Sequence, residues 1–421
     1  MSPVEKTYQN SSAGGFLYER MVIMVLTNCR VIPELCEGFQ EEMVDIRIEG
    51  KTIAEILPAG GHYVGEEVVD CTGKTVLPGL FNVHVHLGFN FDYMMHDFSE
   101  QTSFLTSMRY MNTLLSYGYT SLRECGASYG IPIRLRDEIN RGALIGPDIK
   151  ACGNILTPYL TCTPEHLKHL GTASDGRPID GPYRMRAEAR NEISKGADFL
   201  KIFGGCPYGA FMKRGPESVF FPDELDEVKK VAALEHTYVA SHCISTENVA
   251  EAIELEFRTI EHALYMTPDN VDQLLAHGNK SLLVPTFTVQ YLLLSEEDMM
   301  AAYGNMRLAH DAGALIGWGT DAMENMFFAN PAAEFLGREK CMHLSPVEIL
   351  KQATINSAII NETEKERGSI KVGKYADFAI VDGKPDEDLT VFGRPCALVF
   401  KDGELVAQNG MVKYTNPKPA E

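Results

Sequence analysis

The feature that most limits how this chain can fold is a repeated alternation of strand-like and helix-like segments. Apolar strand-like runs occupy residues 74–87, 118–126, 148–156, 197–205, 238–245, 258–264, 280–289 and 314–322. Helical patterns lie between or after them, at residues 185–196, 223–237, 246–257, 267–278 and 345–360. Such alternation is typical of parallel βαβ units. Eight strand–helix units predict a (β/α)8 TIM barrel, an α/β fold, over residues 74–361. An open doubly wound sheet is disfavoured, because no glycine-rich phosphate loop opens the first unit.

The two ends of the chain have a different pattern. Residues 44–57 near the start and 376–408 near the end contain period-2 strands around tight turns, of which "KDG" at 401–403 favours a hairpin. We expect one small β-sandwich domain built from residues 19–73 and 362–421, with the barrel inserted between them. The alternative is two unrelated flaps. Residues 1–18 are polar, and we expect a loose N-terminal extension.

Charge and cysteine content exclude several classes of protein. The formal net charge of −20 argues against nucleic-acid and anionic-membrane partners, since there is no basic surplus to neutralise phosphates. No apolar run approaches the roughly 20 residues that span a bilayer. The N-terminus does not resemble an export signal, and the 10 cysteines show no C-x-x-C spacing. We therefore expect reduced thiols and a cytoplasmic protein.

Two histidines lie one residue apart in the apolar stretch "LPGLFNVHVHLGF" at residues 77–89. Residues two apart on a strand face the same side, so His84 and His86 point together. Such a pair is either packed in a core or half of a metal site. Partners at other strand ends must decide between these interpretations.

Lys201 is the most informative partner. It lies in "ADFLKIFGG", a run that is typical of a fully buried parallel strand. Lysine is almost never buried without a partner. A lysine with a lowered pKa can react with CO₂ to form a carbamate, which is a carboxylate able to bridge two ions. The alternatives are a side chain that reaches solvent at the strand end, or one paired with an acid.

Three further residues close later strands: His242 in "YVASHCIS", His262 in "RTIEHAL" and Asp321 in "ALIGWGTDA". Active residues of (β/α)8 enzymes lie at these carboxyl ends. Alone, His262 fits a core histidine and Asp321 a helix cap. Together, nitrogen and oxygen ligands without thiolate favour zinc, with manganese, cobalt or nickel as substitutes. Glu261 and Thr320 are expected to support these ligands rather than to bind metal.

The sequence resembles the binuclear metal branch of the amidohydrolase superfamily over nearly its whole length. The resemblance rests on "LTNCRVI", "VLPGLFNVHVHL", "GTDA" and "GSIKVGKYADFAIVDG". Within the superfamily, "GYTSLRECG", "DGPYRMRAEAR", "GADFLKIFGG" and "RTIEHAL" are similar to the prolidase-like and carboxypeptidase-like members, which include Xaa-Pro dipeptidases and relatives of imidazolonepropionase. That subgroup hydrolyses Xaa-Pro or other dipeptides and N-acyl amino acids.

The resemblance implies two divalent metal ions, with Zn²⁺ expected. His84, His86 and Asp321 would hold the more buried ion, and His242 and His262 the more exposed one. Lys201, as a carbamate, would bridge them. A hydroxide between the ions would be the nucleophile. Asp321 would accept its proton and pass it to the leaving nitrogen.

Two features of the subgroup are missing. Its Gly-Gly-His-Gly-Asp segment after strand three is replaced by "LTCTPEHLKHLG", where His166 either takes over the oxyanion contact or is a surface loop residue. The aromatic residue or histidine two places after the strand-five histidine is Ile244. Arg186 lies where the subgroup has an arginine, and either binds a substrate carboxylate or belongs to a solvated helix face.

The loop "GGCPYGAFMKRGPESVFF" after Lys201 is expected to line the pocket. Its aromatic residues, Tyr208, Phe211 and Phe220, either contact an apolar substrate or pack the loop.

These observations predict a metal-dependent hydrolase of an amide bond in a small molecule, a dipeptide or N-acyl amino acid with a free carboxylate. A cyclic or other small amide is the alternative at the same site. A mononuclear deaminase is disfavoured because such enzymes lack the bridging lysine. A non-catalytic scaffold is disfavoured because every expected ligand is present. Relatives commonly assemble, so a homo-oligomer is expected.

Overall fold

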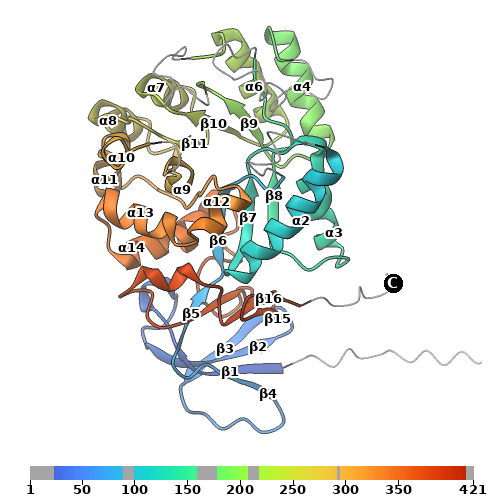
Figure 1. Cartoon of the computed structure of the whole chain (residues 1–421), viewed down its shortest axis with the longest axis vertical. Helices are drawn as coiled ribbons and strands as arrows, with labels where there is room; N and C mark the ends of the chain where they lie inside the picture. Colours follow the sequence, from blue (N-terminus) through green and yellow to red (C-terminus); the bar gives the residue numbers. More distant parts are fainter. Residues whose placement is uncertain (1–22, 89–98, 159–177, 207–217, 292–293, 414–421) are drawn as a thin grey trace, which may run out of the picture.

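A computed structural model describes residues 23–88, 99–158, 178–206, 218–291 and 294–413 of the 421-residue chain. The described chain forms two parts, a barrel and a smaller sheet of strands from both ends (Figure 1). Strands β5 (Lys74–Pro78) and β6 (Leu80–Val85) lead from the smaller sheet into the barrel. Among the described helices, none combines the length and the apolar character that crossing a membrane requires.

The barrel is a ring of parallel strands. Its strands are β6 (Leu80–Val85), β7 (Tyr119–Glu124), β8 (Asp148–Ala151), β9 (Leu200–Phe203), β10 (Val239–Cys243), β11 (Thr259–His262) and β12 (Leu282–Val284). They pair in the order β6-β7-β8 and β9-β10-β11-β12. Three short parallel bridges close the ring: Leu156 pairs with Ile202, and the segment 316–319 pairs through Ile316 with Leu283 of β12 and through Gly319 with Thr286 just after β12. That segment also accepts a bond from β6, through Val83 N–H to the Trp318 carbonyl at 2.7 Å.

The TIM-barrel prediction is therefore confirmed, and residues 314–322 supply the eighth position of the ring as expected. Strands β6, β7 and β10 of the barrel are buried along their whole length, as parallel strands covered by helices are.

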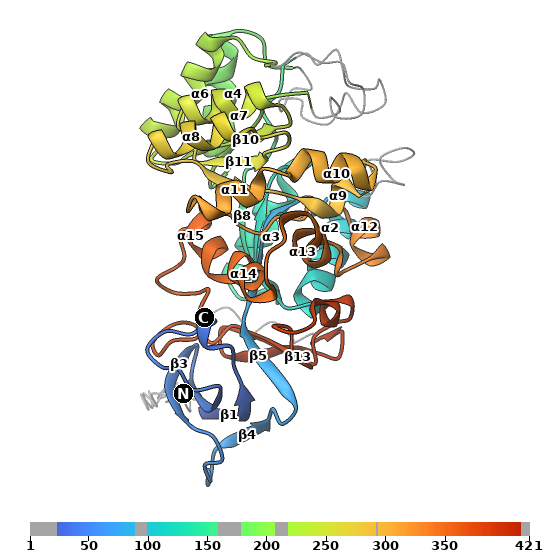
Figure 2. The ribbon, with the colours of Figure 1, turned by 90° about the vertical axis from the view of Figure 1, so that its left-hand side faces the viewer.

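Helices cover the outside of this ring (Figure 2). They are α2 (Glu100–Ser116), α3 (Ile131–Asn140), α4 (Pro182–Ser194), α6 (Pro222–Leu234), α7 (Thr246–Glu254), α8 (Pro268–Ala276), α10 (Glu296–Tyr303), α11 (Met306–Asp311), α13 (Ala333–Met342) and α14 (Pro346–Lys351), with the short α9 (Phe287–Gln290), α12 (Glu324–Ala329) and α15 (Ser357–Ile360). Side chains cap several of them: Ser245, Thr267 and Ser345 accept bonds from the first turns of α7, α8 and α14.

The second part is a nine-stranded sheet from both chain ends. Its strands are β1 (Ile23–Arg30), β2 (Met43–Glu49), β3 (Thr52–Pro58), β4 (Glu67–Asp70), β5 (Lys74–Pro78), β13 (Phe378–Asp382), β14 (Leu398–Lys401), β15 (Glu404–Gln408) and β16 (Met411–Val412). The pairing of β5 with β13 joins the two ends of the chain. Leu26, Ile46, Val76 and Phe378 share one buried core. A sheet domain assembled from both ends agrees with the sequence analysis, although hydrogen bonds join its strands into one sheet.

The strand expected over residues 74–87 divides at Gly79. Lys74–Pro78 belongs to the sheet of the chain ends, and the barrel begins at Leu80, so the expected start of the barrel at residue 74 needs correction. Gly79 N–H donates to the Asp377 carbonyl, while Leu80 N–H donates to the Gly118 carbonyl of the barrel. Apolar patterning could not reveal this division because both strands are buried.

We expect Gly79→Ala to destabilise the protein, because a Cβ there would lie 2.0 Å from Thr120 Oγ1. Overpacking of this kind costs about 1–3 kcal/mol. Urea unfolding would measure the difference. Gly393→Ala is the matched control, since a Cβ at Gly393 meets nothing within 4 Å, and its effect should stay within about 0.5 kcal/mol. Equal stability of both variants would contradict the proposed crowding at the junction.

Most described cysteines are free thiols: Cys29, Cys36, Cys71, Cys125, Cys152, Cys243, Cys341 and Cys396. The expectation of reduced thiols is correct for these and wrong for Cys206, which is disulfide-bonded. Free thiols are typical of reducing compartments and disulfides of oxidising ones. Because the described cysteines include both, they do not indicate one compartment.

Candidate metal centre

The carboxyl ends of the barrel strands carry a cluster of buried polar side chains. His84 lies on β6 and His86 directly follows that strand; Lys201, His242 and His262 lie on β9, β10 and β11. Asp321 follows the segment that closes the ring. The lysine and all four imidazoles are at most 8% exposed. The fold therefore brings polar groups that are 237 residues apart in the chain, from residue 84 to residue 321, to one end of the barrel.

The imidazoles lie against one another and against Asp321. The ring centre of His84 is 5.4 Å from that of His86 and 4.8 Å from that of His262, and the rings of His242 and His262 are 4.4 Å apart. Asp321 Oδ1 lies 3.1 Å from His86 Nε2 and 3.6 Å from His84 Nε2. These distances make one contiguous cluster of the four histidines and the aspartate.

The Nδ1 atoms of three of these histidines are held by the protein. His84 Nδ1 lies 2.7 Å from a Glu261 oxygen, His86 Nδ1 lies 2.7 Å from the Gly126 carbonyl, and His262 Nδ1 lies 2.8 Å from Thr286 Oγ1. A carboxylate or carbonyl at Nδ1 requires the proton there and leaves a lone pair on Nε2. The bonds to Glu261 and Gly126 thus prepare His84 and His86 to bind a cation through Nε2.

Two of the Nε2 atoms have no hydrogen-bond partner within the described part of the chain. These are Nε2 of His84 and Nε2 of His242, and both are buried. A buried polar atom without a partner is unfavourable unless an ion or water satisfies it. The residues therefore fit a divalent cation, which takes neutral imidazole and carboxylate as ligands.

Burial, together with nearby positive charges, keeps most of these imidazoles neutral. Burial, followed by the positive charge of Lys201, holds the pKa of His84 and of His242 well below its usual range. Burial lowers the pKa of His262 in the same way, with the neighbouring imidazoles adding to the effect. For His86, burial lowers the pKa, but the hydrogen bond to Asp321 and the negative charges of Asp321 and Glu124 together outweigh it, and the pKa is raised. Neutral imidazole is the form that binds metal.

Lys201 is 1% exposed, so its side chain does not reach solvent at the strand end. It pairs through the backbone with Ala240 of β10. Among the residues that the structure describes, none forms a hydrogen bond or an ion pair with its ammonium group. Both alternatives considered for a buried lysine, exposure and an acidic partner, are therefore absent from the described structure.

Two of the candidate ligands adopt a left-handed backbone conformation. The φ angle is 67° at His262 and 49° at Asp321. Non-glycine residues adopt such angles at a cost, often at functional sites. At Asp321 the conformation is held by a 2.8 Å bond from its N–H to the His84 carbonyl. Asn82 adds a second tie, since its side chain bonds both the hydroxyl and the N–H of Thr320.

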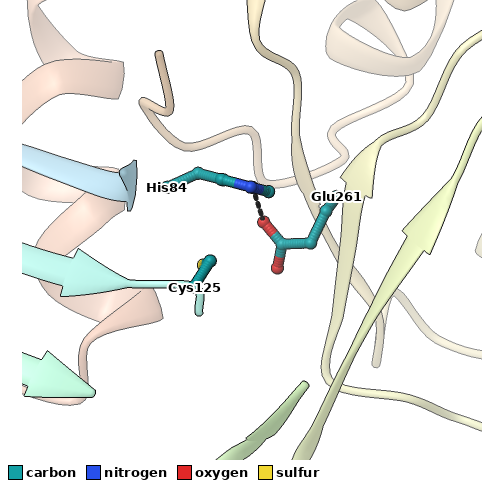
Figure 3. A group of neighbouring side chains, drawn as sticks. All are labelled: His84, Cys125 and Glu261. Atoms are coloured by element: carbon teal, nitrogen blue, oxygen red, sulfur yellow. Dashed lines mark hydrogen bonds and ion pairs between the residues drawn. The ribbon is translucent and has the colours of Figure 1, made fainter. Parts of the chain in front are cut away.

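Glu261 and Cys125 lie beside His84 in the barrel interior (Figure 3). Two groups of described residues are close enough to hold a cation: His84 with His262 and Asp321, and His84 with Cys125 and Glu261. The second group is poorly suited. Burial raises the pKa of Cys125 to about 12, so its thiol stays protonated, and Glu261 already binds His84.

Sequence patterns did not reveal the contributions of Asn82, Arg123, Cys125 and Thr286. Their partners lie on other strands, and no local motif marks such contacts. The partial signal for Arg123 was a charged residue within an apolar run, as for Lys201.

The contacts of Arg186 lie outside the cluster of histidines and Asp321. It lies on α4, its Nε donates to Glu227 of α6 at 2.6 Å, and its guanidinium lies over the ring of Tyr183. Its contacts match the solvated helix face rather than a carboxylate site. Ile244 and Phe220 are buried. His166, Tyr208 and Phe211 lie outside the described residues.

Comparisons with known proteins agree on one family. Residues 75–406 match the amidohydrolase family. The chain is 25% identical to ochratoxinase of Aspergillus niger over 384 residues, which cover 80% of this chain and 76% of the relative. It is 28% identical to imidazolonepropionase of Treponema denticola, covering 83% of this chain and 88% of the relative. A crystal structure of a Xaa-Pro dipeptidase with bound methionine superposes with a TM-score of 0.77 at 25% identity, covering 91% of this chain and 99% of that one.

Proposed function

Because the chain belongs to the amidohydrolase family, and is therefore a hydrolase, we propose that it is a binuclear metal-dependent enzyme that cleaves an amide bond. The observation that carries this proposal is the buried Lys201, whose ammonium has no partner in the described structure, beside the cluster of histidines and Asp321. A single ion would leave this lysine unexplained. Its conversion to a carbamate would replace a buried cation by a bridging carboxylate.

The ligand assignment follows from the cluster. We propose that one ion is held by His84, His86 and Asp321, a second by His242 and His262, and both by the carbamate of Lys201. Nitrogen and oxygen donors without thiolate favour zinc. When bound, the ions would supply Lewis-acid chemistry, lowering the pKa of water and polarising the scissile carbonyl.

The chain's own residues would position and move the proton. Asp321 Oδ1 lies 3.1 Å from His86 Nε2, so the carboxylate is held at the centre of the cluster. We propose that it accepts the proton of the attacking water and then delivers it to the leaving nitrogen. The bond from its N–H to the His84 carbonyl keeps the carboxylate in place through both transfers.

For the substrate we propose a dipeptide or an N-acyl amino acid with a free carboxylate. The likeness to a Xaa-Pro dipeptidase structure supports this choice. The imidazolonepropionase relative favours a second candidate, hydrolysis of a cyclic or other small amide at the same site. Arg186 is bound to Glu227, so we do not propose it as the partner of the substrate carboxylate.

We expect protein purified without chelator to contain two zinc ions per chain and to hydrolyse members of a library of dipeptides and N-acyl amino acids. Removal of the metal should abolish activity, and added zinc should restore it, because the proposed water activation needs the ions. Elemental analysis and amine release would measure both. Full activity without metal would refute the proposal. Activity only on amides without a carboxylate would select the second candidate.

A further inference from the structure

Next to the proposed metal ligand His84, the barrel interior holds a buried ion pair. Glu261 of β11 and Arg123 of β7 are both 0% exposed. Arg123 Nη2 donates to Glu261 Oε1 at 2.6 Å. A buried ion pair is costly to form and is weak evidence for a role in stability. Its position beside a candidate ligand suggests another role.

Every polar atom of the Glu261 side chain is occupied. Oε1 accepts from Arg123 and from the Thr259 hydroxyl, which lies 2.5 Å away. Oε2 accepts from His84 Nδ1 at 2.7 Å, as Figure 3 shows. Both oxygens of this carboxylate are therefore engaged by protein donors, and a cation at Oε2 would have to compete with His84.

Arg123 is fixed as firmly as its partner. Its Nε donates to the Val83 carbonyl at 2.6 Å and its Nη1 to Thr259 Oγ1 at 2.9 Å. Its guanidinium lies over the ring of Phe199, 5.2 Å from the ring centre. Burial disfavours the charged form of Arg123, but the Glu261 carboxylate raises the pKa above its ordinary value. The guanidinium therefore stays charged and balances the carboxylate.

We propose that Glu261 is a positioning residue for His84, balanced by Arg123, and that it does not itself bind metal. This inference rests on the proposed function, because it gives His84 the role of a ligand. The carboxylate holds the proton of His84 on Nδ1, fixes the ring plane and directs the Nε2 lone pair toward Asp321 and the proposed ion. A carboxylate behind an imidazole also makes the imidazole a stronger ligand.

The geometry disfavours the alternative, a cation bound among His84, Cys125 and Glu261. These ligand atoms lie within 4.8 Å of one another. A cation there would have to replace the proton between His84 and Glu261, and it would lie next to the Arg123 guanidinium. Two like charges in a buried space repel strongly. Arg123 thus protects the bond between Glu261 and His84 from a competing cation.

The test is Glu261→Gln, which keeps the shape of the side chain and removes its charge. We expect the affinity for zinc to fall about 10- to 100-fold, the effect typical of losing such a partner. Competition with a chromophoric zinc chelator would measure this affinity without using activity. At saturating zinc the variant should still bind two ions, because no ligand has been removed.

Glu334→Gln is the matched control. Glu334 is also buried and pairs with an arginine, Arg338, at 2.9 Å, but its other bonds go to Phe287 and Thr288 and not to a histidine. The Glu334→Gln variant should be less stable than the unaltered protein but should bind zinc with the same affinity. If Glu261→Gln fails to fold with Arg123 left unpaired, the double variant Arg123→Met/Glu261→Gln removes both charges and should show the same loss of affinity.

Two results would overturn the inference. Unchanged zinc affinity in the folded Glu261→Gln variant would show that the carboxylate does not position His84. Saturation at one ion instead of two would show that Glu261 is itself a ligand. If the unaltered protein binds no zinc, the proposed function fails first, so the two failures are distinguishable.

Discussion

Replacing Lys201 by alanine is expected to remove metal and activity together. The side chain is 1% exposed beside the imidazoles, and the proposed carbamate would be the protein ligand shared by both ions. Loss of a partner that merely orients a ligand already costs about 10- to 100-fold. Loss of a bridging ligand should therefore lower kcat/KM by more than about 100-fold. Zinc per chain and kcat/KM, measured on the same preparation, would test this expectation.

Two additions separate a lost ligand from a lost fold. Lys229→Ala, which removes an exposed lysine on α6, should keep full metal content and activity. Acetate or formate added to Lys201→Ala can enter the vacated space as a carboxylate and should restore part of the activity. A ¹³C signal from labelled bicarbonate should appear in the unaltered protein and be lost in Lys201→Ala. Undiminished metal and activity in the variant would refute the site.

The sequence predicted those parts of the molecule that depend on local pattern. The alternation of strands and helices follows from local apolar patterns in the sequence, so the barrel could be predicted without knowledge of any contact. The end of each parallel strand is a defined place in such a barrel, so His84, Lys201, His242 and Asp321 could be expected at one end of it. Lys201 was informative for a physical reason, since an apolar strand rarely buries a lysine.

What escaped prediction depends on contacts between distant segments. The division at Gly79 is invisible in a continuous apolar run, because both sheets bury their strands there. The bonds from Arg123 to Glu261 and from Asn82 to Thr320 join residues that are 138 and 238 positions apart in the chain. Arg186 is an example of a sequence position whose role depends on a distant contact. Its place in the sequence suggested a bond to a substrate carboxylate, but in the structure it forms an ion pair with Glu227 of a neighbouring helix.

The conformation of Asp321 makes one substitution unusually informative. Its φ of 49° lies in the left-handed region, which asparagine tolerates better than most residues. Asp321→Asn therefore keeps the backbone, the side-chain shape and one oxygen donor. It removes the charge and the ability to take up a proton. Alanine would add backbone strain to the chemical change and could not separate them.

We expect Asp321→Asn to lower kcat by about 10²- to 10⁴-fold at saturating zinc, the contribution typical of a general base or acid. The bond from the N–H of residue 321 to the His84 carbonyl should persist, so the thermal unfolding temperature should change little. Asp311→Asn, on the exposed side of α11 where Asp311 pairs with Arg307, should leave kcat unchanged. A kcat within about twofold of the unaltered enzyme at full metal content would exclude Asp321 as the proton acceptor, because a lost general base costs at least about 10²-fold.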